Sequence, residues 1–324
     1  MINHLKVNES AAQSTKVLLE QSGALNRDFL PINKGGHIFW PLNFEVDGEI
    51  ILMEGKPSTR VSRDYRANLP DDLRDITPRA FDIFGDIAIL KLPYDLEPHF
   101  KIISESIVNS NKNINKVAID LGVKGDYRVR KLKMIHGEDT FVATHKENGL
   151  TFVLDISKVY FSPRLSMERN RLSKLVSSGE KVLDAFAGAA PFSVTLAKQG
   201  AFVKSIDSNP DAENWAIHNY KLNNVSEQNF SFHCSEIENY NFGDASFDRI
   251  IMNNPTNSLS YLTLLSKLVK LNGYIHFYYI DSKEDDFNIQ KILGDGFICT
   301  KVRKVHPYSP ATLLKVFDIK RIKH

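Results

Sequence analysis

The sequence contains little of what would build a metal site, a disulfide scaffold or a membrane span. Its two cysteines, Cys234 and Cys299, lie far apart and belong to no CxxC, HxxxH or HExxH motif. This predicts a reduced, cytoplasmic protein that has no built-in metal site. The N-terminus lacks the apolar segment of a signal peptide, and no apolar run reaches the roughly 18 residues that a transmembrane helix needs.

A strong charge of either sign is also missing. The chain has 41 Lys and Arg against 39 Asp and Glu, a formal net charge of +2, so a nucleic-acid-binding surface would need local clustering of the basic residues. A hydrophobic content of 42% is ordinary for a globular protein, and 324 residues suggest two or three domains. No extended apolar stripe is left over, and we therefore expect a monomer.

The first half of the chain predicts two small α+β units. Residues 10–22 have helical character, and residues 37–43 and 49–54 have the pattern of strands. The charged stretch 56–81 contains three prolines and little apolar periodicity, which predicts a linker. Further predicted elements are a strand at 84–93, a helix at 95–109, strands at 115–121 and 127–135, and a hairpin at 141–156 with an Asn-Gly turn.

From about residue 180, strands and helices alternate. This pattern predicts a mainly parallel, doubly wound sheet with helices on both faces. Predicted strands are 181–186, 202–207, 230–234, 247–253, 273–280, 297–304 and 312–320, and predicted helices are 191–199, 210–224, 258–270 and 284–293. Because no helix separates the last two strands, we expect the final one to run antiparallel. The predicted domains are 1–70, 71–172 and 173–324.

A cofactor loop is predicted in residues 182–193, VLDAFAGAAPFS, which form the pattern strand, small-residue turn, helix. Gly188 and the alanines after it let backbone N–H groups approach an anionic group, and Pro191 suits the first turn of a helix. Asp207 ends the next strand, where a carboxylate can accept hydrogen bonds from ribose hydroxyls. A GxGxxG pattern is absent, so the loop favours S-adenosylmethionine over NAD.

Five segments resemble a known enzyme family: FDIFGDIAILKLP, HKENGLTFVLDISKVYFSPRLSMERNRL, VLDAFAGAAPFS, IDSNPDA and HPYSP. Over roughly residues 80–320 the chain resembles the archaeal and eukaryotic type of tRNA (guanine-37-N1)-methyltransferase, and YFSPRL-x-x-ER-x-R is its most specific stretch. The resemblance implies a class I methyltransferase fold, Rossmann-like, whose last strand is antiparallel. It also implies that the target guanine next to the anticodon receives a methyl group from S-adenosylmethionine.

Roles for two residues follow from this resemblance. N1 of neutral guanine carries a proton, so a base must remove it, and the family's glutamate matches Glu168. The family's arginine that stabilises negative charge on O6 matches Arg128, with Arg130 as the alternative two residues further on. Arg164 and Arg169 are suited to holding the glutamate or a phosphate. Substrate-binding residues implied by the resemblance are Tyr160, Arg164, Asn253 and Pro255, and cofactor-binding residues are Asp184, Phe186, Gly188, Ala190, Pro191, Phe192, Asp207, Asn209, Glu236 and Asn253.

The implied partner is tRNA. The second unit and the methyltransferase domain would hold the anticodon stem-loop, and the N-terminal unit would contact the tRNA body. A wybutosine-pathway enzyme, which methylates a tricyclic base or transfers an aminocarboxypropyl group at the same position, stays open as an alternative. A non-catalytic tRNA-binding protein stays open as well.

Three departures from the family pattern motivate these alternatives. Gly-Ala-Ala replaces Gly-Val-Gly, which is costly if Ala190 needs a positive φ angle. Asn-Asn-Pro replaces Asn-Leu-Pro, so Asn254 stands where an apolar residue is expected. Ser235-Glu236 replaces Gly-Asp, and Glu236 would then reach the adenine amino group with a longer arm.

Overall fold

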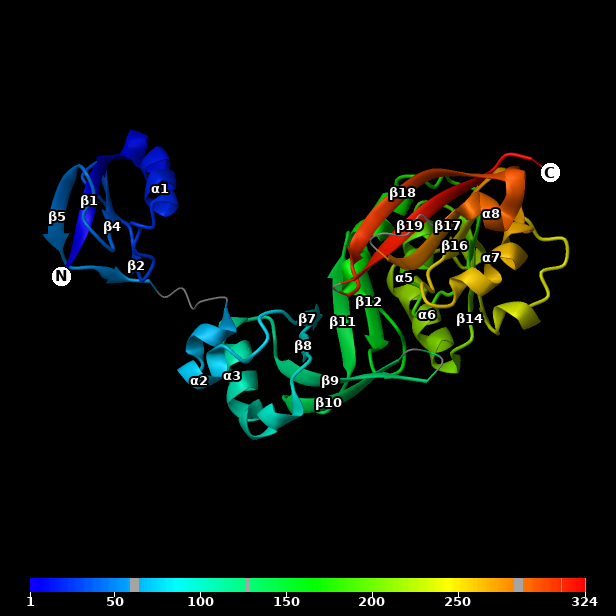
Figure 1. Ribbon diagram of the computed structural model, residues 1–324, viewed down its shortest axis with the longest axis horizontal. Coiled ribbons are helices and arrows are strands. Elements are labelled where there is room, and N and C mark those ends of the chain that lie inside the picture. Colours follow the sequence, from blue (N-terminus) through cyan, green and yellow to red (C-terminus); the bar gives the residue numbers. More distant parts are fainter. Residues whose placement is uncertain (59–63, 126, 128, 283–287, 310, 324) are drawn as a thin grey trace. The chain divides into compact units, whose positions relative to one another are not determined.

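The chain folds into two compact units, Met1–Asp64 and Tyr65–His324 (Figure 1). The computed structural model describes residues 1–58, 64–125, 127, 129–282, 288–309 and 311–323. Among these residues, every helix is too short or too polar to cross a lipid bilayer.

The first unit is a four-stranded antiparallel sheet that packs against one helix. The strand order is β3-β4-β1-β5, and the bounds are β1 Ile2–Asn8, β3 Ile32–Lys34, β4 His37–Pro41, β5 Glu49–Met53 and α1 Ala12–Gln21. A separate short pair joins β2 (Phe29–Leu30) to β6 (Lys56–Pro57). The predicted helix and both predicted strands are confirmed, and the sequence pattern missed β1.

The linker predicted over residues 56–81 is wrong for residues 65–74, and residues 59–63 of this stretch lie outside the described residues. Short helices η2 (Tyr65–Asn68) and α2 (Asp71–Arg74) occupy this stretch. Tyr65, Leu69 and Leu73 are buried and pack in one apolar cluster with α3 (Phe100–Ser110). They recur every four residues, which is a helical spacing that the surrounding charges obscured.

The second unit begins with a four-stranded sheet of order β10-β9-β8-β7. Its strands are β7 Asp82–Phe84, β8 Ile87–Leu90, β9 Lys116–Lys124 and β10 Val129–His136. The single strand predicted at 84–93 is therefore a hairpin, β7–β8, which turns at Gly85 with φ +57°. A side chain at Gly85 would collide with the carbonyl oxygen of Thr144, so the turn requires glycine on two grounds.

The predicted Asn-Gly hairpin is confirmed as β11 (Val142–Glu147) and β12 (Leu150–Asp155), with positive φ at Asn148 and Gly149. Side chains of α6 (Pro210–Leu222) and the residue after it complete its edge. Asn219 Oδ1 accepts the N–H of Val153 at 2.7 Å, and Asn223 Oδ1 accepts that of Thr151 at 2.9 Å. These two amides accept backbone N–H groups that a neighbouring strand would otherwise bind, and they attach the hairpin to the helix.

The seven-stranded sheet has the order β15-β14-β13-β16-β17-β19-β18. Its strands are β13 Lys181–Asp184, β14 Phe202–Asp207, β15 Phe230–Cys234, β16 Phe247–Met252, β17 Val269–Ser282, β18 Phe297–Pro307 and β19 Thr312–Arg321. The first five run parallel, and β19 is antiparallel to both of its neighbours. The predicted class I methyltransferase sheet, with its antiparallel last strand, is thus confirmed.

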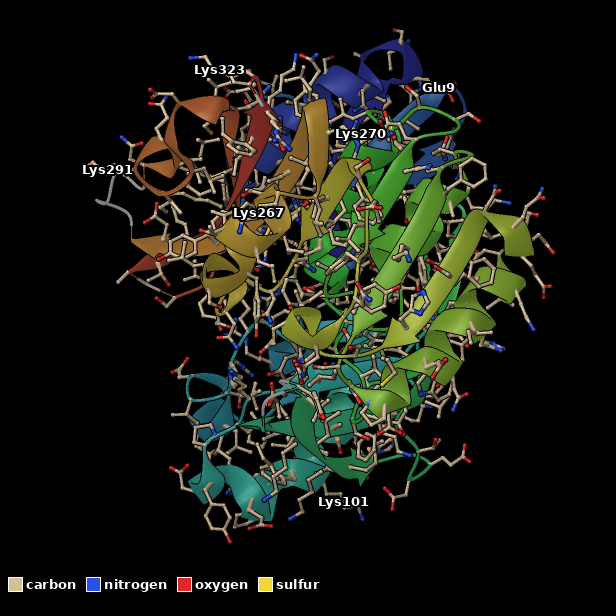
Figure 2. All side chains as sticks on the ribbon, turned by 90° about the vertical axis from the view of Figure 1, so that its right-hand side faces the viewer. Glu9, Lys101, Lys267, Lys270, Lys291 and Lys323 are labelled. Atoms are coloured by element: carbon tan, nitrogen blue, oxygen red, sulfur yellow. The ribbon has the colours of Figure 1, made fainter. Side chains whose placement is uncertain are left out.

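Helices cover both faces of this sheet. One apolar core contains Ile251 with residues of α4 (Ser166–Ser173), α5 (Pro191–Ala197) and α6, and the other contains Ile250 with residues of α7 (Ser258–Ser266) and α8 (Ile289–Leu293). Successive residues of β16 therefore face opposite cores, which explains its continuous apolar run. Exposed lysines such as Lys267, Lys291 and Lys323 lie outside these cores (Figure 2). The helix predicted at 258–270 ends at Ser266, and residues 284–287 of the helix predicted at 284–293 lie outside the described residues.

The buried stretch between residues 65 and 81 generates a stability prediction. We expect Leu73→Ala to lower the free energy of unfolding of the second unit by about 2–5 kcal/mol, because Leu73 is 4% exposed within a packed cluster. Ile76→Ala is the matched control, since Ile76 is 55% exposed and should change stability by less than about 0.5 kcal/mol. Calorimetric unfolding of both variants measures this, and equal small effects would restore the linker interpretation.

Candidate active site

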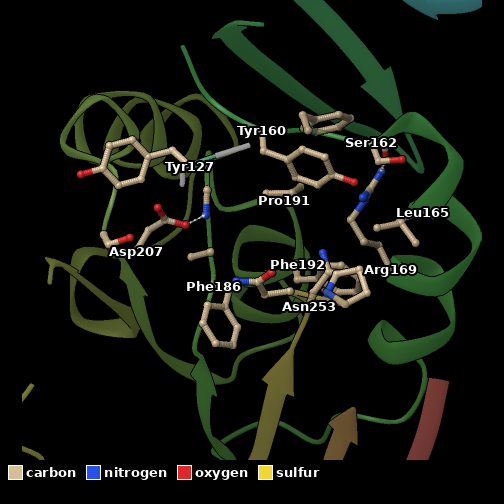
Figure 3. A pocket seen from close by; sticks show the side chains of 16 residues that line it. Tyr127, Tyr160, Ser162, Leu165, Arg169, Phe186, Pro191, Phe192, Asp207 and Asn253 are labelled. Atoms are coloured by element: carbon tan, nitrogen blue, oxygen red, sulfur yellow. Dashed lines mark hydrogen bonds between the residues drawn. The ribbon is translucent and has the colours of Figure 1, made fainter. Parts of the chain in front are cut away.

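A pocket lies at the carboxyl ends of β13, β14 and β16, where parallel sheets commonly bind ligands (Figure 3). It measures about 780 Å³ including its open mouth. Three further parts of the second unit contribute to it: the tip of the β9–β10 hairpin, the segment after β12, and α4. The lining residues are Tyr127, Tyr160, Phe161, Ser162, Leu165, Arg169, Phe186, Ala187, Gly188, Pro191, Phe192, Asp207, Ser208, Asn253, Asn254 and Pro255.

Gly188 and Asp207 form one side of the pocket. Asp207 Oδ2 accepts the N–H of Gly188 at 2.7 Å, and its Oδ1 accepts that of Asn209 at 2.9 Å. Burial raises the pKa of Asp207, and the nearby carboxylate of Glu236 raises it further. Gly188 has φ +52°, and a Cβ there would come within 3.0 Å of the carbonyl oxygen of Tyr160. Only glycine meets both conditions, which explains the single glycine of the loop.

Ala190 adopts a conformation that glycine would adopt without strain. Its φ of +63° and ψ of +36° are left-handed, and it is fully buried at the start of α5. An alanine in this conformation costs roughly 1–2 kcal/mol relative to the right-handed region. Because the family has glycine at this position, the alanine adds backbone strain to this turn.

Asp184 is a buried carboxylate behind the loop. Its Oδ2 accepts a hydrogen bond from Ser193 Oγ at 2.6 Å, and a hydroxyl chain continues through Ser205 to Tyr220 on α6. Its Oδ1 has no hydrogen-bond partner among the residues that the structure describes. Burial raises the pKa of Asp184 to about 7. A buried carboxylate with an unpaired oxygen is suited to a cationic ligand, and S-adenosylmethionine carries a sulfonium and an ammonium group.

Arg169 is the one cation among the described residues that line the pocket, and its side chain is 1% exposed. It donates from Nε and Nη2 to the two oxygens of Glu147, at 2.5 and 2.6 Å, and from Nη2 to the carbonyl oxygen of Ser162 at 3.0 Å. Its guanidinium also lies 4.8 Å from the ring centroid of Phe161. In Figure 3, Arg169 and Asp207 lie on opposite sides of the pocket.

Glu147 is thus the partner of Arg169, in place of the expected Glu168 or phosphate. Burial acts to raise the pKa of Glu147, but hydrogen bonds from His145 and Arg169 outweigh it and lower the pKa to about 2. Glu147 lies in one of the segments that resemble the family, but its pairing with Arg169 could not be predicted, because it connects β11 to a helix 22 residues away.

Glu168 is not among the lining residues, although it neighbours Arg169 on α4. It is 6% exposed, and its Oε2 accepts hydrogen bonds from Arg171 Nε at 2.8 Å and Tyr278 Oη at 3.3 Å. Arg303 Nε lies 3.8 Å from its Oε1. The ring of Tyr278 packs 5.6 Å from that of Phe192, a lining residue, so the carboxylate lies directly behind the pocket wall.

The other predicted catalytic residue, Arg128, lies outside the described residues. Arg130, its alternative, is bound to two carboxylates, Asp82 at 3.0 Å and Asp120 at 3.5 Å. Arg164 also donates to Asp82, from Nε at 3.0 Å and from Nη2 at 2.7 Å. Neither arginine lines the pocket, so the structure gives no direct contact between them and a target base.

Most of the other predicted site residues come together. Tyr160, Phe186, Gly188, Pro191, Phe192, Asp207, Asn253 and Pro255 all line the pocket. Asn209 instead caps α6 through the N–H of Asp211 and donates to the carbonyl oxygen of Lys158, and Glu236 lies just after β15, outside the lining. The predicted cofactor-binding residues Asp184 and Ala190 are buried and are not among the lining residues either. Sequence analysis missed the lining residues Tyr127, Phe161, Ser162, Leu165, Ala187 and Ser208, three of which belong to the YFSPRL stretch that it had singled out.

Asn254, the residue that the family pattern leaves unexplained, lines the pocket and begins the turn into α7. Its side-chain oxygen accepts a hydrogen bond from Thr256 Oγ1 at 3.3 Å, and its carbonyl oxygen accepts the N–H of Ser258 at 2.7 Å. Within the described part of the chain, no group of three or more His, Cys, Asp or Glu side chains is placed to hold a metal ion.

Comparison with known proteins adds a family to this geometry. Residues 143–295 match the profile of the TRM5/TYW2 methyltransferase domain, and residues 61–140 match that of the TYW2 N-terminal domain. A tRNA (guanine(37)-N(1))-methyltransferase Trm5b of Pyrococcus abyssi is 36% identical over 87% of this chain and 86% of its own length.

Solved structures agree with this match. The crystal structure of Trm5b from Pyrococcus abyssi superposes with a TM-score of 0.81 at 31% identity, covering 99% of this chain and 100% of that one. A complex of aTrm5 with tRNALeu gives 0.75 at 28%, covering 98% and 99%. Methanocaldococcus jannaschii Trm5 in complex with adenosine gives 0.70 at 27%, covering 99% and 100%.

The buried pair Glu147–Arg169 generates a prediction about stability and pH. We expect Arg169→Met to lower the free energy of unfolding by about 3–5 kcal/mol, because it leaves Glu147 buried without its main partner. The double variant Glu147→Leu/Arg169→Met should recover most of this loss. Since the pKa of Glu147 is lowered to about 2, the pair's contribution is complete above pH 4.5 and declines as the pH falls toward 2.

Urea unfolding between pH 7 and pH 3 measures both effects. The wild type should lose more stability over this range than the double variant does. A double variant that is less stable than Arg169→Met alone would contradict this account of the pair.

Asp184 generates a prediction about ligand binding. If its unpaired oxygen faces a cationic cofactor, its ionisation around pH 7 should strengthen binding, so affinity for S-adenosylmethionine should rise on the order of tenfold between pH 6 and pH 8. The control is Asp184→Asn, which keeps the shape and cannot ionise. Isothermal titration calorimetry gives the dissociation constant of both proteins at each pH. Because the ligand's own amino group titrates equally in both experiments, the difference between the two proteins isolates the contribution of Asp184. If the affinities of both proteins change in parallel with pH, the assignment is refuted.

Proposed function

The chain belongs to the TRM5/TYW2 methyltransferase family, and from this we propose that it transfers a methyl group to N1 of guanosine 37 in tRNA with Glu168 as the general base. The cofactor is S-adenosylmethionine. The observation that carries the proposal is one pocket in which a cofactor side and a substrate side meet at the carboxyl ends of the parallel strands.

The cofactor side consists of Gly188, Asp207 and the start of α5. The N–H groups of the small-residue loop and the helix N-terminus favour negatively charged groups, and Asp207 can accept hydrogen bonds from ribose hydroxyls. Asp184 places a carboxylate behind the loop, where it favours a positively charged ligand. When bound, S-adenosylmethionine supplies an electrophilic methyl group.

The substrate side consists of Tyr160, Asn253 and Pro255. A tyrosine ring and a proline ring offer flat apolar surfaces to a nucleobase, and the Asn253 amide can both donate and accept hydrogen bonds along the edge of guanine. To reach this pocket, base 37 must leave the stack of the anticodon loop.

Proton transfer from N1 is assigned to Glu168. In this step the N1–H bond would break and the proton would pass to the Glu168 carboxylate. The N1 electron pair would form the new bond to the methyl carbon as the bond from that carbon to the sulfonium sulfur breaks, and the electron pair of the broken bond would stay on the sulfur. The carboxylate lies directly behind the wall formed by Phe192, and Arg171 and Tyr278 hold it there. We infer that it exchanges its contact with Arg171 for the N1–H group when substrate enters. Arg128 is proposed to stabilise the negative charge on O6.

The remaining parts of the proposal concern tRNA and the domains. The recognition domain predicted over residues 1–70 corresponds to the first unit, Met1–Asp64, and would contact the tRNA body. The anticodon stem-loop would lie against the domains predicted over 71–172 and 173–324. A monomer acting in the cytoplasm is consistent with two unpaired, exposed cysteines. Aminocarboxypropyl transfer and a purely binding role have less support, because the relatives that match over most of the chain are named as guanine-37-N1 methyltransferases.

The test of the reaction compares tRNA transcripts that carry G or A at position 37. We expect the wild type to methylate only the G37 transcript, and mass spectrometry of the nucleosides should identify 1-methylguanosine. Glu168→Gln should lower the single-turnover rate by about 10²–10⁴-fold, since it removes the base and keeps the shape of the side chain.

Glu180→Gln is the matched control for this variant. Glu180 is also ion-paired, with Arg249 Nε at 3.0 Å, and it lies just before β13 at the opposite edge of the sheet. This control should keep the wild-type rate. Equal methylation of the A37 and G37 transcripts would overturn the assigned reaction. Equal rates for Glu168→Gln and Glu180→Gln would overturn the assignment of Glu168 as the base.

A further inference from the structure

A chain of ion pairs connects the small sheet to the wall of the pocket. In order, Asp120 on β9 contacts Arg130 on β10, Arg130 contacts Asp82 on β7, and Asp82 contacts Arg164 just after Tyr160. The distances are 3.5, 3.0 and 2.7 Å. Asp82 is the shared acceptor, since one of its oxygens binds Arg130 and the other binds Arg164 twice.

Both arginines are attached to residues that line the pocket. Arg130 is the second residue of β10, next to the turn of the β9–β10 hairpin, and Tyr127 in this turn is a lining residue. Arg164 belongs to the segment 160–165, in which Tyr160, Phe161, Ser162 and Leu165 are lining residues. One carboxylate therefore joins two walls of the pocket that are more than 30 residues apart in sequence.

Asp82 and Arg130 also border a small hollow with Tyr160. Phe161 and Pro163 are among its other lining residues, and it shares Tyr160 and Phe161 with the main pocket. The Asp82 carboxylate and the tyrosine that is proposed to meet the target base therefore line the same hollow.

The two ion pairs of Asp82 differ in exposure. The side chain of Asp82 is 19% exposed and that of Arg130 is 22% exposed, whereas that of Arg164 is 56% exposed. Burial acts to raise the pKa of Asp82, but hydrogen bonds from Arg164 and Arg130 outweigh it and lower the pKa. Charge-assisted bonds to a half-buried carboxylate fix geometry more tightly than a solvated pair does.

We propose that Asp82 is a positioning residue for methyl transfer: by binding Arg130 and Arg164 with one carboxylate, it sets the spacing between the hairpin that carries Tyr127 and the segment that carries Tyr160. This inference rests on the proposed function. It also gives Arg164 a partner within the protein, in place of a phosphate, and it explains why Arg130 is unavailable to the O6 atom of guanine.

The experiment uses the full-length Asp82→Asn variant, which keeps the shape of the side chain and removes its charge. We expect the single-turnover rate of G37 methylation to fall by about 10–100-fold, because a displacement of about 1 Å at a site wall has effects of this size. The dissociation constant for S-adenosylmethionine, measured by calorimetry, should change by less than about twofold. Asp82→Glu, which keeps the charge, should recover part of the rate.

A double-variant cycle tests whether Asp82 acts through Arg164. We expect Arg164→Gln to lower the rate, and Asp82→Asn/Arg164→Gln to be no slower than the slower single variant, because both changes break the same contact. Asp248→Asn is the matched control: Asp248 is bound by Lys270 at 2.8 Å, its pKa is also lowered, and it lies at the amino end of β16 away from the pocket. This control should keep the wild-type rate.

The possible outcomes separate the two proposals. If the wild type does not methylate a G37 transcript, the proposed function fails. If the wild type is active and Asp82→Asn has the wild-type rate, the positioning role of Asp82 is overturned. The role is also overturned if Asp248→Asn loses as much rate as Asp82→Asn, or if the losses of Asp82→Asn and Arg164→Gln are fully additive. Either result would mean that the variants destabilise the protein generally and that Asp82 does not act through Arg164.

Discussion

The buried guanidinium of Arg169 is the interaction on which the arrangement of the pocket depends. It joins α4 to three other parts of the second unit: the β11–β12 hairpin through Glu147, the segment after β12 through the Phe161 ring and the carbonyl oxygen of Ser162, and α5 through the ring of Phe192. A buried ion pair gives little net stability compared with apolar side chains of the same size, because both charges lose their water. The ion pair instead fixes the positions of these parts relative to one another, because a planar guanidinium has its donors in a fixed arrangement.

Two further sets of polar contacts extend this arrangement away from Arg169. The amides of Asn219 and Asn223 fix the hairpin to α6, and Asp82 fixes the small sheet to the segment after Tyr160. The first contacts join a hairpin to a helix, and the second joins a strand to a segment that lines the pocket. The apolar core that contains Phe84 and Phe152 also contains Val182 and Val316, so the small sheet, the hairpin and the large sheet share one core. The parts that line the pocket are therefore connected by polar contacts and by this shared core.

The fold was predictable from sequence wherever the pattern is local. Alternating strands and helices after residue 180 predict the large sheet, and Asn148-Gly149 predicts the hairpin turn. The errors have physical causes. Charges between Tyr65, Leu69 and Leu73 hide their helical spacing, and apolar residues on both sides of Gly85-Asp86 hide the turn between two strands. In the site, Gly188 and Asp207 belong to a local motif and could be found. The ion pairs of Glu147 and Asp82 could not, although both residues lie in segments that resemble the family, because only the tertiary fold brings Arg169 and Arg164 near them, 22 and 82 residues away.

The neighbours Glu168 and Arg169 show a further limit of a motif. A helix turns by about 100° per residue, so two adjacent side chains of α4 face different surroundings. Arg169 lines the pocket, and Glu168 lies behind its wall in contact with Arg171 and Tyr278. The sequence indicates that both residues belong to the site and cannot indicate which of them faces it.

The cofactor loop combines two features that each oppose folding. Ala190 holds a left-handed backbone that strains an alanine, and Asp184 is a buried carboxylate whose raised pKa reports an unfavourable environment for its charge. Strain of this kind persists only where the surrounding structure determines the backbone, and it concentrates at ligand sites. Here the surroundings are the packed start of α5 and the hydroxyl chain from Ser193 to Tyr220. A cationic ligand near Asp184 would relieve the electrostatic part of this cost, so binding energy and local stability are coupled at the same loop.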